Sequence, residues 1–120
     1  MKPALVLVAL AALLAANTAR ASHPELIASV GLHNAYTISL RTPNGKLVRS
    51  LRAGTYSIVV HDYSKIHNFA LGSQTENKRI FTTGIPWVGT RTYTVKLAPG
   101  NYAYACSAHP QTMNGTFVVT

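Results

Sequence analysis

Short stretches of alternating apolar and polar residues run through the chain from Ser29 to its end. A period of two predicts β-strands that bury one face. The alternation covers Tyr36–Leu40, Tyr56–Val60, Tyr93–Leu97, Tyr102–Cys106 and Phe117–Val119. No segment of this region has a sustained helical period. Many short strands at this spacing predict an all-β domain, either an antiparallel sandwich or a barrel.

Turn signals separate these stretches. Asn44-Gly45 follows Pro43 and favours a tight hairpin, and Pro99-Gly100 predicts a second turn. A short helix between Ser73 and Thr83 is compatible with the sequence, although no periodicity supports it. Trp87 follows a Gly-Ile-Pro stretch, and we expect it to pack in the core.

The first 21 residues have a different pattern. A short basic start at Lys2 precedes an unbroken apolar run from Ala4 to Ala16. Because about 20 residues are needed to span a bilayer, this run is too short for a transmembrane helix. Ala19 and Ala21 provide the small residues that signal peptidase requires. We therefore expect residues 1–21 to be a cleaved signal peptide, residues 22–120 to form one domain, and the protein to be periplasmic or secreted.

The charge is strongly unbalanced, with 11 Lys and Arg residues against three acidic ones and a net charge of +8. Loss of Lys2 and Arg20 with the signal would leave a net charge of +6. Such a surface favours an acidic partner or an anionic membrane surface. The basic residues are scattered and form no dense run, and the export signal also argues against a nucleic-acid partner. We expect a monomer without stable membrane insertion.

The segment before the last strand carries three side chains that bind soft metals. Cys106 ends a predicted strand, and His109 and Met113 follow within eight residues. Alone, the single cysteine of an exported chain could be a buried thiol, an interchain disulfide or a metal ligand, and composition favours the buried thiol. A thiolate, an imidazole and a thioether in one loop suit copper better than calcium or magnesium. A second histidine must come from elsewhere.

Four other histidines could complete such a site. His67 lies beyond the far end of the Tyr56–Val60 strand and precedes Asn68-Phe69. His61 shares a strand face with polar residues and fits a surface position. His23 lies at the expected mature terminus, and His33 precedes an early strand. The position of His67 at a strand end makes it our choice.

These residues together resemble the blue copper proteins, the cupredoxins that include plastocyanins, azurins, amicyanins and pseudoazurins. The resemblance covers about Ser29 to Thr120 and depends on two patterns. One is His67-Asn68-Phe69, and the other is Tyr102-x-Tyr104-x-Cys106-x-x-His109-x-x-x-Met113-x-Gly115-x-Phe117. It implies a Greek-key β-sandwich that holds one type 1 copper ion at one end.

The resemblance also implies a role for each residue. His67, Cys106 and His109 would be the strong ligands, Met113 the weak axial ligand, and Asn68 would tie the two ligand loops together. Three residues separate His109 from Met113, as in azurins, whereas plastocyanins have four. The chain has no second cysteine for the additional disulfide of plant phytocyanins.

Electron transfer is the function that this ligand set favours. Two imidazoles, a thiolate and a long thioether suit both oxidation states of copper. We expect a non-enzymatic electron carrier with a redox partner protein, because the sequence shows no nucleophile–base pair or phosphate loop and Asp62 fits a loop carboxylate. The alternatives are a periplasmic copper protein for storage, delivery or resistance, and a contact module in which the metal is incidental.

Overall fold

The computed structural model describes residues 2–4 and 22–120, so most of the expected signal peptide lies outside the described residues. The described part forms a β-sandwich with one short 3₁₀ helix, η1 (Leu32–Asn34). Its strands are β1 (Glu25–Val30), β2 (Ile38–Arg41), β3 (Ser50–Leu51), β4 (Gly54–Asp62), β5 (Ala70–Ser73), β6 (Lys78–Thr82), β7 (Gly89–Leu97), β8 (Gly100–Ala105) and β9 (Asn114–Val119). No helix among the described residues is long and apolar enough to cross a membrane.

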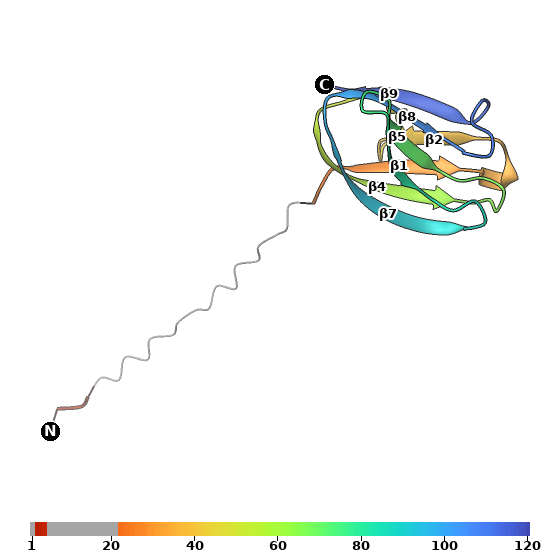
Figure 1. The fold of residues 1–120 in the computed structure, drawn as a ribbon. Coiled ribbons are helices and arrows are strands. Elements are labelled where there is room, and N and C mark those ends of the chain that lie inside the picture. Colours follow the sequence, from red (N-terminus) through yellow and green to blue (C-terminus); the bar gives the residue numbers. More distant parts are fainter. Residues whose placement is uncertain (1, 5–21) are drawn as a thin grey trace.

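Two sheets stack face to face (Figure 1). One has the strand order β2-β1-β4-β7, and the other has the order β3-β9-β8-β5-β6. The pairs β1–β4 and β3–β9 are parallel, and the other pairs are antiparallel. The chain changes sheets repeatedly, which confirms the expected all-β Greek-key sandwich.

The core lies between the inner faces of the sheets, as the alternation predicts. Tyr56, Ile58 and Val60 of β4 are buried, and so are Tyr102 and Tyr104 of β8. The aromatic rings of this layer stack, with Phe69 and Tyr104 centroids 5.2 Å apart and those of Tyr102 and Phe117 5.3 Å apart. Aromatic burial on this scale supplies much of the hydrophobic stabilisation of a small domain.

Two local expectations, the helix between Ser73 and Thr83 and the position of Trp87, need correction. The segment from Ser73 to Thr83 is not a helix, because β5 and β6 form a hairpin whose turn includes Asn77 with φ 50°. Asn44-Gly45 does form a turn, with the Gly45 N–H donating to Thr42 O at 2.9 Å. As predicted, the chain returns antiparallel to β2 after this turn, with a bridge between Arg41 and Leu47 and the Val48 N–H donating to Leu40 O at 2.9 Å. Only then does β3 pair with β9 in the other sheet.

Trp87 is also placed differently from the expectation. It lies half-buried in the loop before β7, and the Arg91 guanidinium is 4.8 Å from its ring centroid. A cation over the face of an indole is stabilised by the ring quadrupole, and Trp87 is not among the buried residues that form the core. Trp87 therefore packs on the outside of the sandwich and not in the core.

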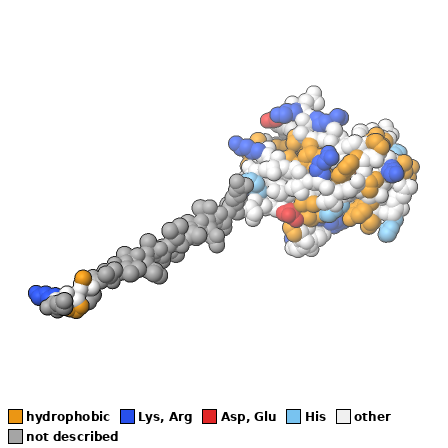
Figure 2. All heavy atoms as spheres, turned by 90° about the horizontal axis from the view of Figure 1, so that it is seen from below, with side chains coloured by type: hydrophobic (Ala, Val, Ile, Leu, Met, Phe, Trp, Pro, Cys, Tyr) orange, Lys and Arg blue, Asp and Glu red, His pale blue; other side chains and the backbone are white. Residues whose placement is uncertain are grey.

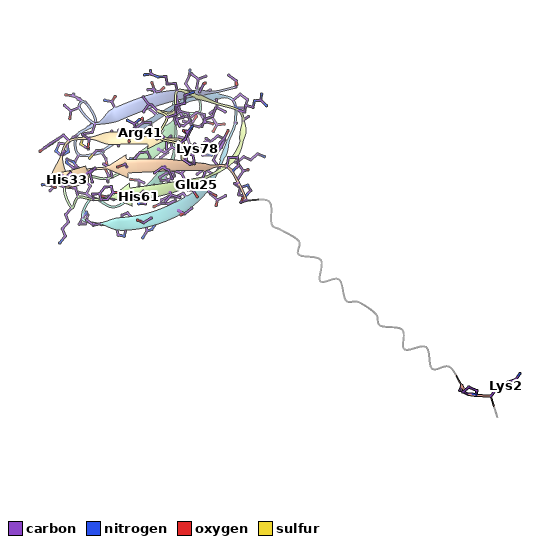
Figure 3. The ribbon with its side chains drawn as sticks, turned by 180° about the vertical axis from the view of Figure 1, so that it is seen from behind. Lys2, Glu25, His33, Arg41, His61 and Lys78 are labelled. Atoms are coloured by element: carbon purple, nitrogen blue, oxygen red, sulfur yellow. The ribbon has the colours of Figure 1, made fainter. Side chains whose placement is uncertain are left out.

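Several loops meet at one end of the sandwich. β1 and β4 run in parallel toward it, away from the end where residues 22–24 enter (Figure 1). Figure 3 shows His33 at the loop end and Glu25 at the opposite end. Figure 2 shows hydrophobic and histidine side chains lying together at the loop end. The expected metal ligands all belong to loops at this end.

Candidate metal centre

His67, Cys106 and His109 converge at the loop end of the sandwich. Cys106 immediately follows β8, His109 lies three residues later, and His67 lies in the loop between β4 and β5. The two Nδ1 atoms of the histidines are 3.1 Å apart. Cys106 Sγ lies 3.8 Å from His67 Nδ1 and 3.7 Å from His109 Nδ1. Within the described ranges, these three residues make up the group of His, Cys and acidic side chains able to share a metal ion.

The two Nδ1 atoms and Cys106 Sγ form a triangle whose size fits metal–ligand bond lengths. A point equidistant from the three atoms lies about 2.1 Å from each of them, within the usual range for metal bonds to imidazole nitrogen and thiolate sulfur. The two imidazole nitrogens also face each other, so a bound cation would accept both lone pairs. The donor set is soft, which favours copper over calcium or magnesium. The residues therefore fit the metal that the resemblance implies.

Met113 lies beside Cys106 and is fully buried. The Cys106 N–H donates to Met113 O at 3.0 Å, and the Met113 N–H donates to His109 O at 2.9 Å. The His109 N–H in turn donates to Cys106 O at 3.1 Å. These three backbone hydrogen bonds fold the loop so that Met113 returns to the position of Cys106. The assignment of its sulfur as the axial ligand remains a prediction.

Asn68 joins the two ligand loops, as the resemblance implies. Its side-chain amide donates to Thr83 O at 3.0 Å and to Ser107 Oγ at 2.6 Å, and its Oδ1 accepts from the Ser107 N–H at 2.7 Å. Its backbone N–H lies 3.4 Å from Cys106 Sγ and donates toward it. Such a hydrogen bond orients the sulfur and stabilises its thiolate form.

The environment of His67 favours the neutral, metal-binding form of the imidazole. The ring is completely buried, and this burial lowers its pKa. A positive charge on nearby His109 lowers the pKa further, while the backbone at Asn34 opposes the shift. Metal binding requires an unprotonated ring nitrogen, so burial prepares His67 for this role.

The other histidines lie elsewhere, as expected. His61 is half-buried on β4, with its Nδ1 3.0 Å from Thr90 Oγ1. His33 and His23 are exposed, and neither belongs to the cluster. Asp62 is buried at the end of β4 and accepts from the Ser64 N–H at 3.0 Å, which agrees with a structural loop carboxylate.

Sequence reasoning missed one segment of the site, residues 31–36 between β1 and β2. Its last residue, Tyr36, places its ring against the imidazoles of both His67 and His109. The alternation of apolar and polar residues does not indicate this contact, because it predicts Tyr36 only as the first residue of a strand. The contact arises only when β1 and β4 lie side by side.

No protein-family model and no curated protein sequence matches the chain. Solved structures do match in fold. Rusticyanin from Thiobacillus ferrooxidans aligns with a TM-score of 0.57 and 18% identity over 80% of this chain and 76% of its own. A second structure, described as the copper protein rusticyanin, has a TM-score of 0.60 and 19% identity with the same coverage.

Auracyanin A from Chloroflexus aurantiacus, described as a blue copper protein, aligns with a TM-score of 0.54 and 19% identity. That alignment covers 80% of this chain and 98% of auracyanin A. The two-sheet topology and these similarities show that the chain has the cupredoxin fold.

Proposed function

We propose that this protein is an exported blue copper protein that binds one copper ion through His67, Cys106, His109 and Met113 and carries single electrons. The convergence of one sulfur and two imidazole nitrogens around a point about 2.1 Å from each supports this proposal most strongly. The similarity in fold to rusticyanin and auracyanin A adds support from proteins described as copper proteins.

Bound copper would supply a centre that alternates between two oxidation states by one electron. The surrounding residues would keep its ligands in one arrangement in both states. His67 and Cys106 are fully buried, which excludes water from the inner side of the site. His109 is only partly buried, so its ring gives the site its contact with the surface. We therefore infer that electrons enter and leave through the His109 imidazole.

Copper addition tests the proposal directly. One equivalent of copper(II) should give the purified protein a strong thiolate-to-copper absorption in the visible range. Cys106→Ser should remove this band, because a hydroxyl does not replace the thiolate. Tyr102 and Tyr104 precede Cys106 on β8 and are buried but would not be ligands, so Tyr102→Phe is a matched control that should keep the band.

Redox cycling separates electron transfer from storage or delivery. A carrier should bleach with a mild reductant, recover its colour with an oxidant, and retain its copper through repeated cycles. Loss of copper to a chelator on each reduction would instead favour delivery to a partner. A protein that shows no thiolate absorption with copper would contradict the proposal as a whole.

The proposed partner is an acidic redox protein. Residues 22–120 carry a net charge of +6, and Figure 2 shows Lys and Arg side chains distributed over the surface. Electron transfer to an acidic partner should therefore slow as salt rises, since exposed charges are screened beyond about 8 Å at physiological ionic strength. A rate that does not change with salt would assign docking to the apolar residues around His109.

Export is tested by mass spectrometry, which should find Ser22 at the N-terminus of the periplasmic protein.

A further inference from the structure

Three rings form a compact cluster at the loop end of the sandwich. The centroid of Tyr36 is 4.8 Å from that of His67 and 4.7 Å from that of His109, and the two imidazole centroids are 4.9 Å apart. The interplanar angles of the three pairs are 72°, 71° and 68°, so each pair is edge-to-face. This geometry is favoured by the ring quadrupoles. Tyr36 therefore contacts both histidines of the candidate metal centre at once.

Tyr36 lies on the solvent side of these imidazoles. Its side chain is 58% exposed, whereas His67 is completely buried and His109 is partly buried. An aromatic residue this exposed contributes little to the hydrophobic core, so core packing does not account for its position. Its buried portion is the part that covers the imidazoles.

The segment that carries Tyr36 has an unusual backbone. Gly31, His33 and Asn34 have φ values of 71°, 55° and 60°, in the left-handed region that non-glycine residues rarely adopt. Side-chain and backbone contacts hold this conformation: Ser64 Oγ bonds to Asn34 Oδ1, and the Gly31 N–H donates to Thr37 O at 2.9 Å. Such conformations persist where the surrounding structure enforces them, often at functional sites.

The same segment packs directly on the His67 loop. A Cβ atom at Gly31 would lie 2.5 Å from Ser64 Cβ and 3.1 Å from His67 Cδ2, so only glycine fits there. This close approach brings the residues 31–36 onto the metal-site loop and places Tyr36 over the rings. The close approach of Gly31 to Ser64 and His67 thus anchors the segment that carries Tyr36.

We propose that Tyr36 is a positioning residue that closes the solvent side of the metal centre and holds the His67 and His109 imidazoles in their ligand orientations. This inference rests on the proposed copper site. A bound metal is lost when a ligand ring turns away and water or another ligand takes its place. The ring edge of Tyr36 obstructs both events at His109, the most exposed of the three clustered ligands. Its hydroxyl is not required, because the contacts are made between rings.

The first test uses the metal-free protein and does not depend on copper. Histidine ring resonances should be recorded by NMR for the wild type and for Tyr36→Ala, Tyr36→Phe and Tyr63→Ala. Tyr63 is a matched control, because it is also exposed but its ring stacks on His61 at 6.1 Å. Loss of the Tyr36 ring current should shift the His67 and His109 resonances. Tyr36→Phe should keep the His67 and His109 resonances at their wild-type positions, and Tyr63→Ala should shift only the resonances of His61.

The second test measures metal release. The copper-loaded proteins are mixed with an excess of a chelator, and loss of the thiolate band is followed with time. Tyr36→Ala should lose copper about tenfold faster than the wild type, which corresponds to about 1.4 kcal/mol for the two ring contacts. Tyr36→Phe and Tyr63→Ala should match the wild type. Added imidazole should perturb the spectrum of Tyr36→Ala and leave that of Tyr36→Phe unchanged. Tyr36→Leu replaces the alanine variant if that variant does not fold.

The outcomes separate this inference from the proposed function. Unchanged histidine resonances in Tyr36→Ala, or copper release at the wild-type rate, would overturn the role of Tyr36 while leaving the copper site intact. Failure of the wild type to bind copper would contradict the proposed function, and the metal-free NMR comparison would still decide whether Tyr36 contacts both imidazoles.

Discussion

Two regions of the loop end build the candidate site in different ways. The loop between β8 and β9 carries Cys106, His109 and Met113 within eight residues and is closed by its own backbone hydrogen bonds. The opposite side is assembled from residues 31–36 and 63–68, which follow β1 and β4. That side depends on the parallel pairing of two strands and on burial. One region is thus local in sequence, and the other exists only in the folded domain.

The two regions contribute differently to the candidate metal centre. The local loop carries three of the four proposed ligands, and the backbone hydrogen bonds that shape it join its own residues. The assembled side supplies one buried imidazole, a bridging amide and a covering ring, each of which restricts motion at the site. We therefore expect variants of the assembled side to show whether the loop between β8 and β9 can hold a copper ion without the contacts from residues outside it.

The largest effect is expected for His67, the one proposed strong ligand of the assembled side. His67→Ala should abolish the thiolate-to-copper absorption, because two of the three converging atoms do not complete the site. His61→Ala and His33→Ala are controls on the same side of the molecule and should keep the band. Absorption spectra after copper(II) addition measure the result. Loss of colour in His33→Ala alone would show that the wrong histidine has been assigned.

A smaller effect is expected when the link between the regions is cut. Asn68→Ala removes three side-chain hydrogen bonds that a buried residue makes to Thr83 and Ser107. It should lower the free energy of unfolding by about 2–3 kcal/mol. Denaturant unfolding of the metal-free protein measures this loss.

Asn114 provides the control for this experiment. It is exposed, and its side chain makes a single hydrogen bond, to Pro110 O at 2.8 Å. Asn114→Ala should change stability by less than about 1 kcal/mol. Equal losses for the two variants would mean that Asn68 is no more important than an ordinary surface amide.

Met113 tests the local loop at its weakest proposed ligand. A thioether binds reduced copper better than oxidised copper, whereas an amide oxygen favours the oxidised ion. Met113→Gln should therefore keep a coloured site and lower the reduction potential, as measured by redox titration. If both spectrum and potential stay unchanged, Met113 is a packing residue of the core.

The smallest effect concerns Asp62, which anchors the start of the His67 loop. Burial raises the pKa of its carboxyl from 3.8 to about 6, partly offset by the hydrogen bond from the Ser64 backbone. The folded state therefore holds this proton more tightly than the unfolded chain, and Asp62 lowers stability as pH rises from about 4 to about 6. The difference in unfolding free energy between Asp62→Asn and the wild type should grow in favour of the variant over this window. A difference independent of pH would show that the carboxyl titrates normally.

Most of the longer strands were predictable, because one face is buried and the other is more exposed. β4, β7, β8 and β9 follow this rule. The short strands β5 and β6 were not recognised, because four or five residues give too little alternation to separate a hairpin from a helical turn. β1 was not recognised either, although Leu26, Ala28 and Val30 are its buried face. Its pattern begins close to the expected signal cleavage site.

The sequence by itself determined the alternation that makes the chain a sandwich and the short loop that brings Cys106, His109 and Met113 together. These features follow from neighbouring residues, because side-chain periodicity and loop closure act over a few positions. Only the tertiary structure decided that His67 meets them, that Asn68 bonds to Ser107, and that Tyr36 covers the imidazoles. Those contacts join segments about 30 to 70 residues apart, and they form because the parallel pairing of β1 with β4 and the stacking of the two sheets carry the loops to one end.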